Sequence, residues 1–217
     1  MLRRFTNLLY PAKCILCEAF LEEDETDLCH KCRETAPLLD KAKFNISFLA
    51  GWTAVWYYKD APRDSILRYK FSGRRCYAPA YARQLAMKLV KEDLTDCDII
   101  TWVPVAAKRR RERGYDQVAI LATALCKELG RKATRTLRKI RNTPPQSGIA
   151  DASHRRANVL GAYRPVKKKQ IRGKRILLLD DVITTGATAS ECARTLLIAG
   201  AKEVFCAAMA ASNHESK

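Results

Sequence analysis

The chain has 217 residues, of which 47% are hydrophobic, and its 40 lysines and arginines outnumber its 23 acidic residues, giving a formal charge of +17. This composition excludes wholesale disorder, and the length suits one domain with a small appendage. The longest uninterrupted apolar run, 204–211, is far shorter than the ~20 residues that cross a bilayer, and residues 1–14 lack the apolar core of a secretory signal, so we expect a cytoplasmic protein without membrane insertion.

Four of the nine cysteines crowd the first 32 residues as two C-x2-C pairs, Cys14 with Cys17 and Cys29 with Cys32. Each pair presents two thiolates about one tetrahedron edge apart, so the two pairs complete a closed Zn2+ shell. A head of about 30 residues is too small to bury an adequate core, so the zinc is expected to be structural. Two independent redox pairs are the disfavoured alternative, because neither pair opens a helix after a strand. The five scattered cysteines are interpreted as small buried residues.

Hydrophobic periodicity predicts the remaining elements. We take 1–43 as the zinc-binding head and linker, and 44–217 as the main domain. Strands and helices alternate in the main domain, and several strands are continuous apolar runs, which predicts an α/β fold with a parallel sheet flanked by helices. The predicted strands are 52–58, 98–103, 134–137, 174–180 and 203–211. The predicted helices are 60–71, 82–90, 118–129 (capped by Asp116 and ended by Gly130), a short one around 153–159, and 187–199.

Positive charge is concentrated in the middle of the chain. Residues 103–175 contain 21 lysines and arginines but four acidic residues, whereas 1–43 are close to neutral. Such a segment attracts polyanions, and both nucleic acid and multiply phosphorylated small molecules qualify. Lys167, Lys168 and Lys169 suit a nucleic-acid phosphate backbone. A solubilising loop explains these three lysines equally well.

The segment 176–188 is the most informative stretch. Four apolar residues predict a buried strand, and Asp180 and Asp181 follow at its carboxyl end, where open α/β sheets bind ligands. The next residues open a helix whose N–H groups and hydroxyls suit a phosphate monoester, and the glycine permits close approach. Carboxylates beside a phosphate cradle fit a sugar, held directly or through Mg2+. The cradle residues are Thr184, Thr185, Gly186, Ala187 and Thr188.

These thirteen residues resemble the phosphoribosyl pyrophosphate (PRPP) signature of type I phosphoribosyltransferases at every position. The resemblance implies that Asp180 and Asp181 contact the ribose hydroxyls, and that 184–188 cradle the 5′-phosphate. It also places the backbone N–H groups of Val105 and Ala106 at the pyrophosphate, followed by a mobile basic flap. The flap residues are Lys108, Arg109, Arg110, Arg111 and Arg113. A solvated charge run is an equal alternative for this basic loop.

With the four-cysteine head, further motifs make the chain similar to the ComF family of bacterial competence proteins, which join a zinc finger to a phosphoribosyltransferase-like domain. The motifs are Tyr69-Lys70-Phe71-x-Gly73, Val103-Pro104-Val105, Arg111-x-Arg113-Gly114-Tyr115-x-Gln117, Gln146 and Arg155/Arg156-x-Asn158-Val159-x-Gly161. One departure is Asp116, where the family usually has Asn.

The resemblance implies a DNA-uptake factor of natural competence that binds PRPP, with Mg2+, and single-stranded DNA. The zinc head and the basic face would both bind the DNA, and a helicase of the uptake machinery is the implied protein partner. The alternative is an active phosphoribosyltransferase with an unknown acceptor and no assigned catalytic residue. A third interpretation is a zinc-dependent adaptor that retains the phosphate site without using it.

Overall fold

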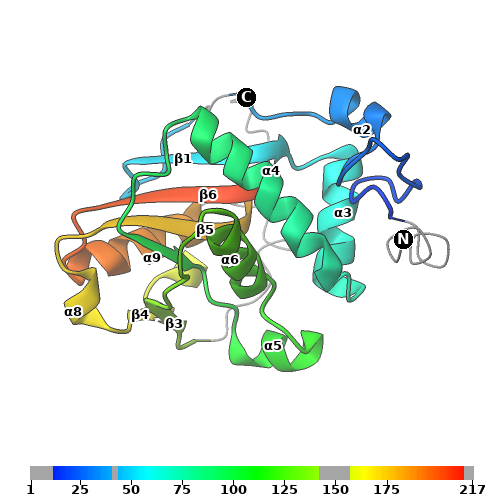
Figure 1. Cartoon of the computed structure of the whole chain (residues 1–217). Coiled ribbons are helices and arrows are strands. Elements are labelled where there is room, and N and C mark those ends of the chain that lie inside the picture. Colours follow the sequence, from blue (N-terminus) through cyan, green and yellow to red (C-terminus); the bar gives the residue numbers. More distant parts are fainter. Residues whose placement is uncertain (1–11, 41–43, 142–156, 213–217) are drawn as a thin grey trace.

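The computed structural model describes residues 12–40, 44–141 and 157–212 (Figure 1). Its central sheet has four strands, each parallel to its neighbour, as predicted. In spatial order they are β1 (Gly51–Tyr57), β6 (Glu203–Ala211), β5 (Arg175–Ile183) and β2 (Ile99–Trp102). A separate antiparallel hairpin pairs β3 (Leu137–Lys139) with β4 (Tyr163–Pro165). In the described part of the chain, no helix combines the length and the apolar character needed to cross a membrane.

Helices cover both faces of the sheet (Figure 1). One face packs against α3 (Asp60–Phe71), α4 (Ala78–Lys91) and α6 (Gln117–Glu128), and the other packs against α9 (Ala187–Ile198). Successive side chains of β5 alternate between the two cores: Leu177 and Leu179 join the first, and Ile176 and Leu178 the second. All four are fully buried, which explains why this strand is a continuous apolar run.

Two predicted elements, α3 and β6, have the observed bounds, and β1, α6 and α9 differ from theirs by one residue at one or both ends. The Asp116 carboxylate accepts the N–H of Ala119 at 3.0 Å, which confirms the predicted cap of α6, and Gly130 follows that helix with a φ of +63°. Strand β5 extends beyond residue 180, where the prediction ends it, because it stays paired with β6 as far as Ile183. The strand predicted at 134–137 is shifted to β3, because the chain at 133–134 pairs with Ile100 instead.

The predicted basic loop is in fact a helix, α5 (Ala107–Arg113). Alanine, lysine, arginine and glutamate all favour helix, and no breaker interrupts them. Gly114 ends the helix in a left-handed conformation with a φ of +77°. Elements that the sequence analysis did not predict are α2 (His30–Thr35), the 3-10 turn η1 (Arg75–Tyr77), β4 and α8 (Lys168–Ile171). Of the helix predicted around 153–159, residues 157–159 are helical and the rest lie outside the described residues.

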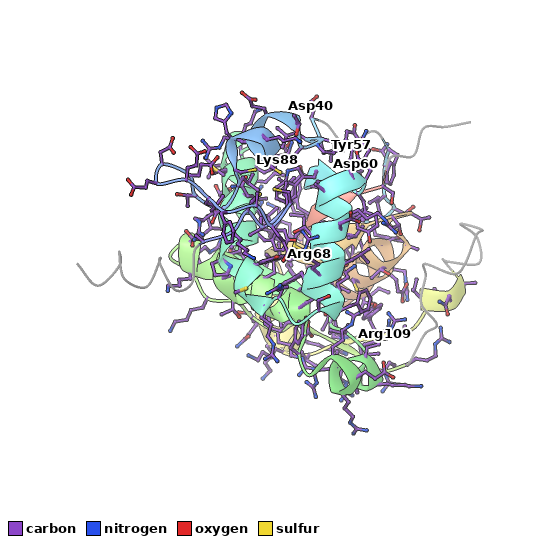
Figure 2. The ribbon with its side chains drawn as sticks, turned by 90° about the vertical axis from the view of Figure 1, so that its right-hand side faces the viewer. Asp40, Tyr57, Asp60, Arg68, Lys88 and Arg109 are labelled. Carbon is purple, nitrogen blue, oxygen red and sulfur yellow. The ribbon has the colours of Figure 1, made fainter. Side chains whose placement is uncertain are left out.

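The N-terminal head packs directly on α3 and α4. Ile15, Leu16 and Leu28 belong to the same buried cluster as the side chains of those helices. Arg68 of α3, labelled in Figure 2, donates to the carbonyl oxygen of Leu16 at 2.5 Å. The guanidinium of Arg83 on α4 contacts both carboxylate oxygens of one head aspartate, Asp27. The head and the sheet domain therefore share one hydrophobic core.

The five scattered cysteines differ in burial. Cys126, Cys192 and Cys206 are buried among apolar side chains, as predicted. Cys97 is half-buried and accepts a hydrogen bond from the guanidinium of Arg131 at 3.0 Å. Cys76 is exposed on η1, so the prediction of burial is wrong for this cysteine.

Candidate functional site

A cavity of about 730 Å³ opens at the carboxyl edge of the sheet. The segments that follow β2 and the last residues of β5 form its floor, because adjacent parallel strands end at the same edge. The predicted site residues that line it are Val105, Arg109, Arg113, Asp180, Asp181, Thr184 and Thr188. Gly186 and Ala187 line a small adjoining hollow with the same two threonines. Thr185 and Ala106 line neither space, and Ala106 is buried at the start of α5.

The acidic pair lies within the last part of β5 and is enclosed by other side chains. Asp180 is 8% exposed, and the side chain of Asp181 is 14% exposed. The Lys70 Nζ lies 2.9 Å from Asp181 Oδ1, and the Gln117 Nε2 donates to Asp181 Oδ2 at 2.8 Å. The Asp181 N–H donates to Asp180 Oδ1 at 2.8 Å. Three of the four carboxylate oxygens of the pair thus accept contacts from the chain itself.

The two carboxyl groups have opposite protonation behaviour. Burial, together with the charge of Asp181, raises the pKa of Asp180 to about 8. Burial also opposes ionisation of Asp181, but the charge of Lys70 and the hydrogen bond from Gln117 outweigh it, so the pKa of Asp181 lies below its usual value. Near pH 7 the pair therefore combines a protonated carboxyl group, which can donate a hydrogen bond, with a carboxylate, which can only accept.

The segment predicted to cradle a phosphate is the turn between β5 and α9. Gly186 has a φ of +73°, and a Cβ added there would lie 2.6 Å from side-chain atoms of Ile46. Both the backbone conformation and the available space therefore require glycine. The first residues of α9, a twelve-residue helix, line the small hollow beside this turn. That arrangement suits an anion, as the sequence predicts.

The basic helix α5 has two distinct faces. Arg109 and Arg113, four residues apart, line the cavity, and the Arg113 guanidinium lies 4.6 Å from the centre of the Phe71 ring. Burial lowers the pKa of Arg113. Lys108, Arg110 and Arg111 are exposed to solvent on the remaining surface. One face of α5 therefore borders the cavity and the other faces solvent.

Four residues without a predicted role lie at the site: Lys70, which lines the cavity, Gln117, which contacts Asp181, and Lys139 and Tyr163, which also line the cavity. The first two occur in the quoted motifs, but only the fold brings them to the acidic pair. The other two come from the β3–β4 hairpin, where the Lys139 Nζ lies 5.3 Å from the centre of the Tyr163 ring. Burial and the charge of Arg109 lower the pKa of Lys139.

The three lysines at 167–169 are exposed at the start of α8, outside the cavity lining. Gln146, Arg155 and Arg156 lie outside the described residues.

The four head cysteines converge on one point. Their Sγ atoms all lie within 4.8 Å of one another, and those of Cys17 and Cys29 are 3.6 Å apart. A tetrahedral zinc with sulfur ligands at ~2.3 Å requires Sγ atoms about 3.8 Å apart, so the cluster fits the ion. Burial opposes ionisation of Cys14, but backbone N–H groups of its neighbours outweigh it and lower its pKa. His30 is exposed and pairs with Glu34, so it is not needed as a ligand.

Comparisons with known proteins match both parts of the chain. The phosphoribosyl transferase domain family matches residues 106–217, and the double zinc ribbon domain matches 5–43, which supports a structural zinc in the cysteine cluster. The chain is 31% identical over 182 residues to competence protein ComFC of Streptococcus pneumoniae, covering 83% of this chain and 74% of the relative. Competence protein F of Haemophilus influenzae is 28% identical over 182 residues, with 81% and 75% covered. DNA utilization protein YhgH of Salmonella typhi is 32% identical over 140 residues, with 62% and 60% covered.

Proposed function

The chain belongs to the ComF family, and on that premise we propose that it is a DNA-uptake factor of natural transformation that binds PRPP and single-stranded DNA. Relatives named as competence and DNA utilization proteins support the role in DNA uptake. The observation that carries the proposal for PRPP is the single cavity in which the acidic pair, the phosphate cradle and the arginines of α5 meet. We further propose that the chain binds a helicase of the DNA-uptake machinery as its protein partner.

In this proposal PRPP lies along the carboxyl edge of the sheet. Asp180 and Asp181 hold the two ribose hydroxyls, one as donor and one as acceptor, and the hydroxyls can serve both. Residues 184–188 bind the 5′-phosphate. Arg109 and Arg113 neutralise the pyrophosphate, which brings Mg2+ with it. The predicted backbone contacts are left out, because the Val105 N–H already donates to Asp116 Oδ2 and Ala106 lies outside the cavity lining. The zinc stays in the head as a structural ion.

The PRPP site is tested by calorimetry on the variant Asp180→Asn/Asp181→Asn. Loss of the hydrogen bond from protonated Asp180 and of the charge-assisted contact of Asp181 should weaken PRPP binding by ~2–4 kcal/mol, about one to two for each contact. Circular dichroism must show that the variant is folded. Asp64→Asn is the matched control, because Asp64 is exposed on α3 and is not part of the cavity lining. Equal PRPP affinity of parent and double variant would show that the assigned site is wrong.

For single-stranded DNA we propose the outer face of α5, formed by Lys108, Arg110 and Arg111. These cations are exposed, and they border the cavity on the same helix as Arg109 and Arg113. The head suits DNA less well than α5, because three exposed acidic side chains follow one another at 22–24 and repel phosphates. The lysines at 167–169 remain a second candidate surface.

An active phosphoribosyltransferase is the alternative function, and one observation favours it. The β3–β4 hairpin places Lys139 and Tyr163 beside Asp180, so the cavity has a second wall that PRPP contacts alone do not require. Its volume lies within the range typical of small-molecule sites. Pyrophosphate release from PRPP in the presence of candidate acceptors would identify the reaction. Binding of PRPP without release in any mixture would favour the DNA-uptake proposal alone.

A further inference from the structure

Lys70 is the cavity residue whose position the proposed binding mode leaves unexplained. It lies in the last turn of α3, next to the fully buried Tyr69, and its side chain is 14% exposed. Its ammonium group lies 2.9 Å from Asp181 Oδ1 and lines the ligand cavity. Because its ammonium group faces a carboxylate, this buried lysine does not serve simply to attract anionic ligands.

The surroundings of the acidic pair are poorly suited to a divalent cation. Mg2+ binds six oxygen ligands in a near-ideal octahedron, and carboxylates supply its usual protein contacts. Here both oxygens of Asp181 are engaged, one by Lys70 and one by the Gln117 amide, and Asp180 Oδ1 accepts a backbone N–H. A magnesium ion at this position would have to displace the ammonium group or lie directly beside it. Both outcomes are electrostatically unfavourable.

We propose that the Lys70 ammonium takes the place of a divalent cation at the acidic pair, so that ribose 5-phosphate binds this site without metal. Lys70 is a positioning residue: it holds Asp181 in place and offers further N–H donors toward the sugar. Any magnesium dependence then arises at the pyrophosphate of PRPP. This inference rests on the proposed PRPP site and concerns the half of the ligand that carries no pyrophosphate.

The test uses the whole, zinc-loaded protein and ribose 5-phosphate as the probe. Isothermal titration calorimetry is performed in magnesium-free buffer and in buffer with Mg2+, without a strong chelator, so that the zinc of the head is retained. We expect the affinity of the parent for ribose 5-phosphate to be equal within about two-fold in the two buffers. A tenfold or larger loss in magnesium-free buffer would overturn the inference and leave the proposed site intact. Absence of binding in both buffers would overturn the site and the inference together.

Variants then assign the effect to the lysine. In magnesium-free buffer, Lys70→Met should weaken ribose 5-phosphate binding at least tenfold, and added Mg2+ should restore part of it, because the vacated position can then accept a cation. Lys70→Arg keeps the positive charge and should retain more affinity than Lys70→Met. The matched control is Lys91→Met, an exposed lysine at the end of α4, which should bind like the parent. Parent-like binding by Lys70→Met in magnesium-free buffer would also overturn the inference.

Discussion

Replacing Asp180 by asparagine should stabilise the protein increasingly as the pH rises. Burial raises the pKa of Asp180 to about 8, whereas an aspartate in the unfolded chain has a pKa of ~3.9. Between these values the unfolded state releases the proton and the folded state retains it, so the parent loses stability as the pH increases. Asparagine has nearly the same shape as the protonated acid and keeps an oxygen that can accept the Asp181 N–H. It has no proton to lose.

The size of the effect follows from the distance between the two pKa values. Each pH unit in this window costs the parent up to ~1.4 kcal/mol, so the advantage of Asp180→Asn should be near zero at pH 4 and reach up to ~4 kcal/mol at pH 7. Asp181 acts in a different window, because its pKa lies below the usual value. Its stabilising contribution is present above the unfolded pKa and is lost only as the pH falls through its folded value.

Urea unfolding followed by circular dichroism at pH 5, 6 and 7 measures the difference between variant and parent. Comparing the two proteins cancels the pH dependence of the zinc site, which both contain. The buffers should contain no phosphate, which would bind the cradle and stabilise the folded state. Asp64→Asn is the control, because it removes an exposed carboxylate of α3 instead of a buried one. A flat difference for Asp180→Asn across this range would show that Asp180 ionises freely in the folded protein.

Three further predictions concern the head, the cradle and the nucleic acid. Metal analysis should find about one zinc per chain, and Cys29→Ser should lower both the zinc content and the unfolding temperature; less than about a tenth of an equivalent in the parent would contradict a structural zinc. Gly186→Ala should destabilise the fold by more than the ~1–2 kcal/mol that Gly173→Ala costs for its left-handed φ alone, since Gly173 has open space around it. Fluorescence anisotropy with a labelled single-stranded oligonucleotide should give a slope of log K against log salt of about −3 to −4, from about four to six phosphate contacts. Neutralising Lys108, Arg110 and Arg111 should reduce the magnitude of this slope by about two and leave PRPP binding intact. Neutralising the lysines at 167–169 is the comparison. A slope near zero in the parent would exclude nucleic-acid binding as a function of the chain.

The parts of the fold that could be predicted are those where a local pattern decides the structure. Strand β5 could be predicted because both of its faces are covered, which makes it a continuous apolar run. Helix α6 could be predicted because Asp116 and Gly130 mark its ends. The cysteine spacing fixes the composition of the head cluster in the same way. The β3–β4 hairpin could not be predicted, because its two short strands lie far apart in the sequence and each has only three residues. Pairing of this kind depends on tertiary packing more than on local preference.

The contacts of the acidic pair depend on a different kind of information. The resemblance identifies Asp180 and Asp181, but nothing in the spacing of residues shows that a lysine from α3 and a glutamine from α6 will meet them. Those contacts exist because both helices pack on the same face of the sheet. The helix α5 differs, because its preference for helix is local: its residues favour helix and Gly114 ends it, so the sequence did contain the signal.

The zinc head and the ligand cavity are connected through α3, which gives the head a role beyond its own folding. Ser65 on this helix donates to the carbonyl oxygen of Ile15, and Arg68 donates to that of Leu16. These two hydrogen bonds hold the turn between Cys14 and Cys17 against α3. Lys70 follows in the next half-turn and contacts Asp181 in the cavity. Because buried packing resists small displacements, the position of the head restrains the helix that delivers the lysine. Loss of zinc should therefore unfold the head and also weaken ligand binding at the acidic pair. The zinc site and the ligand cavity both depend on the packing of α3.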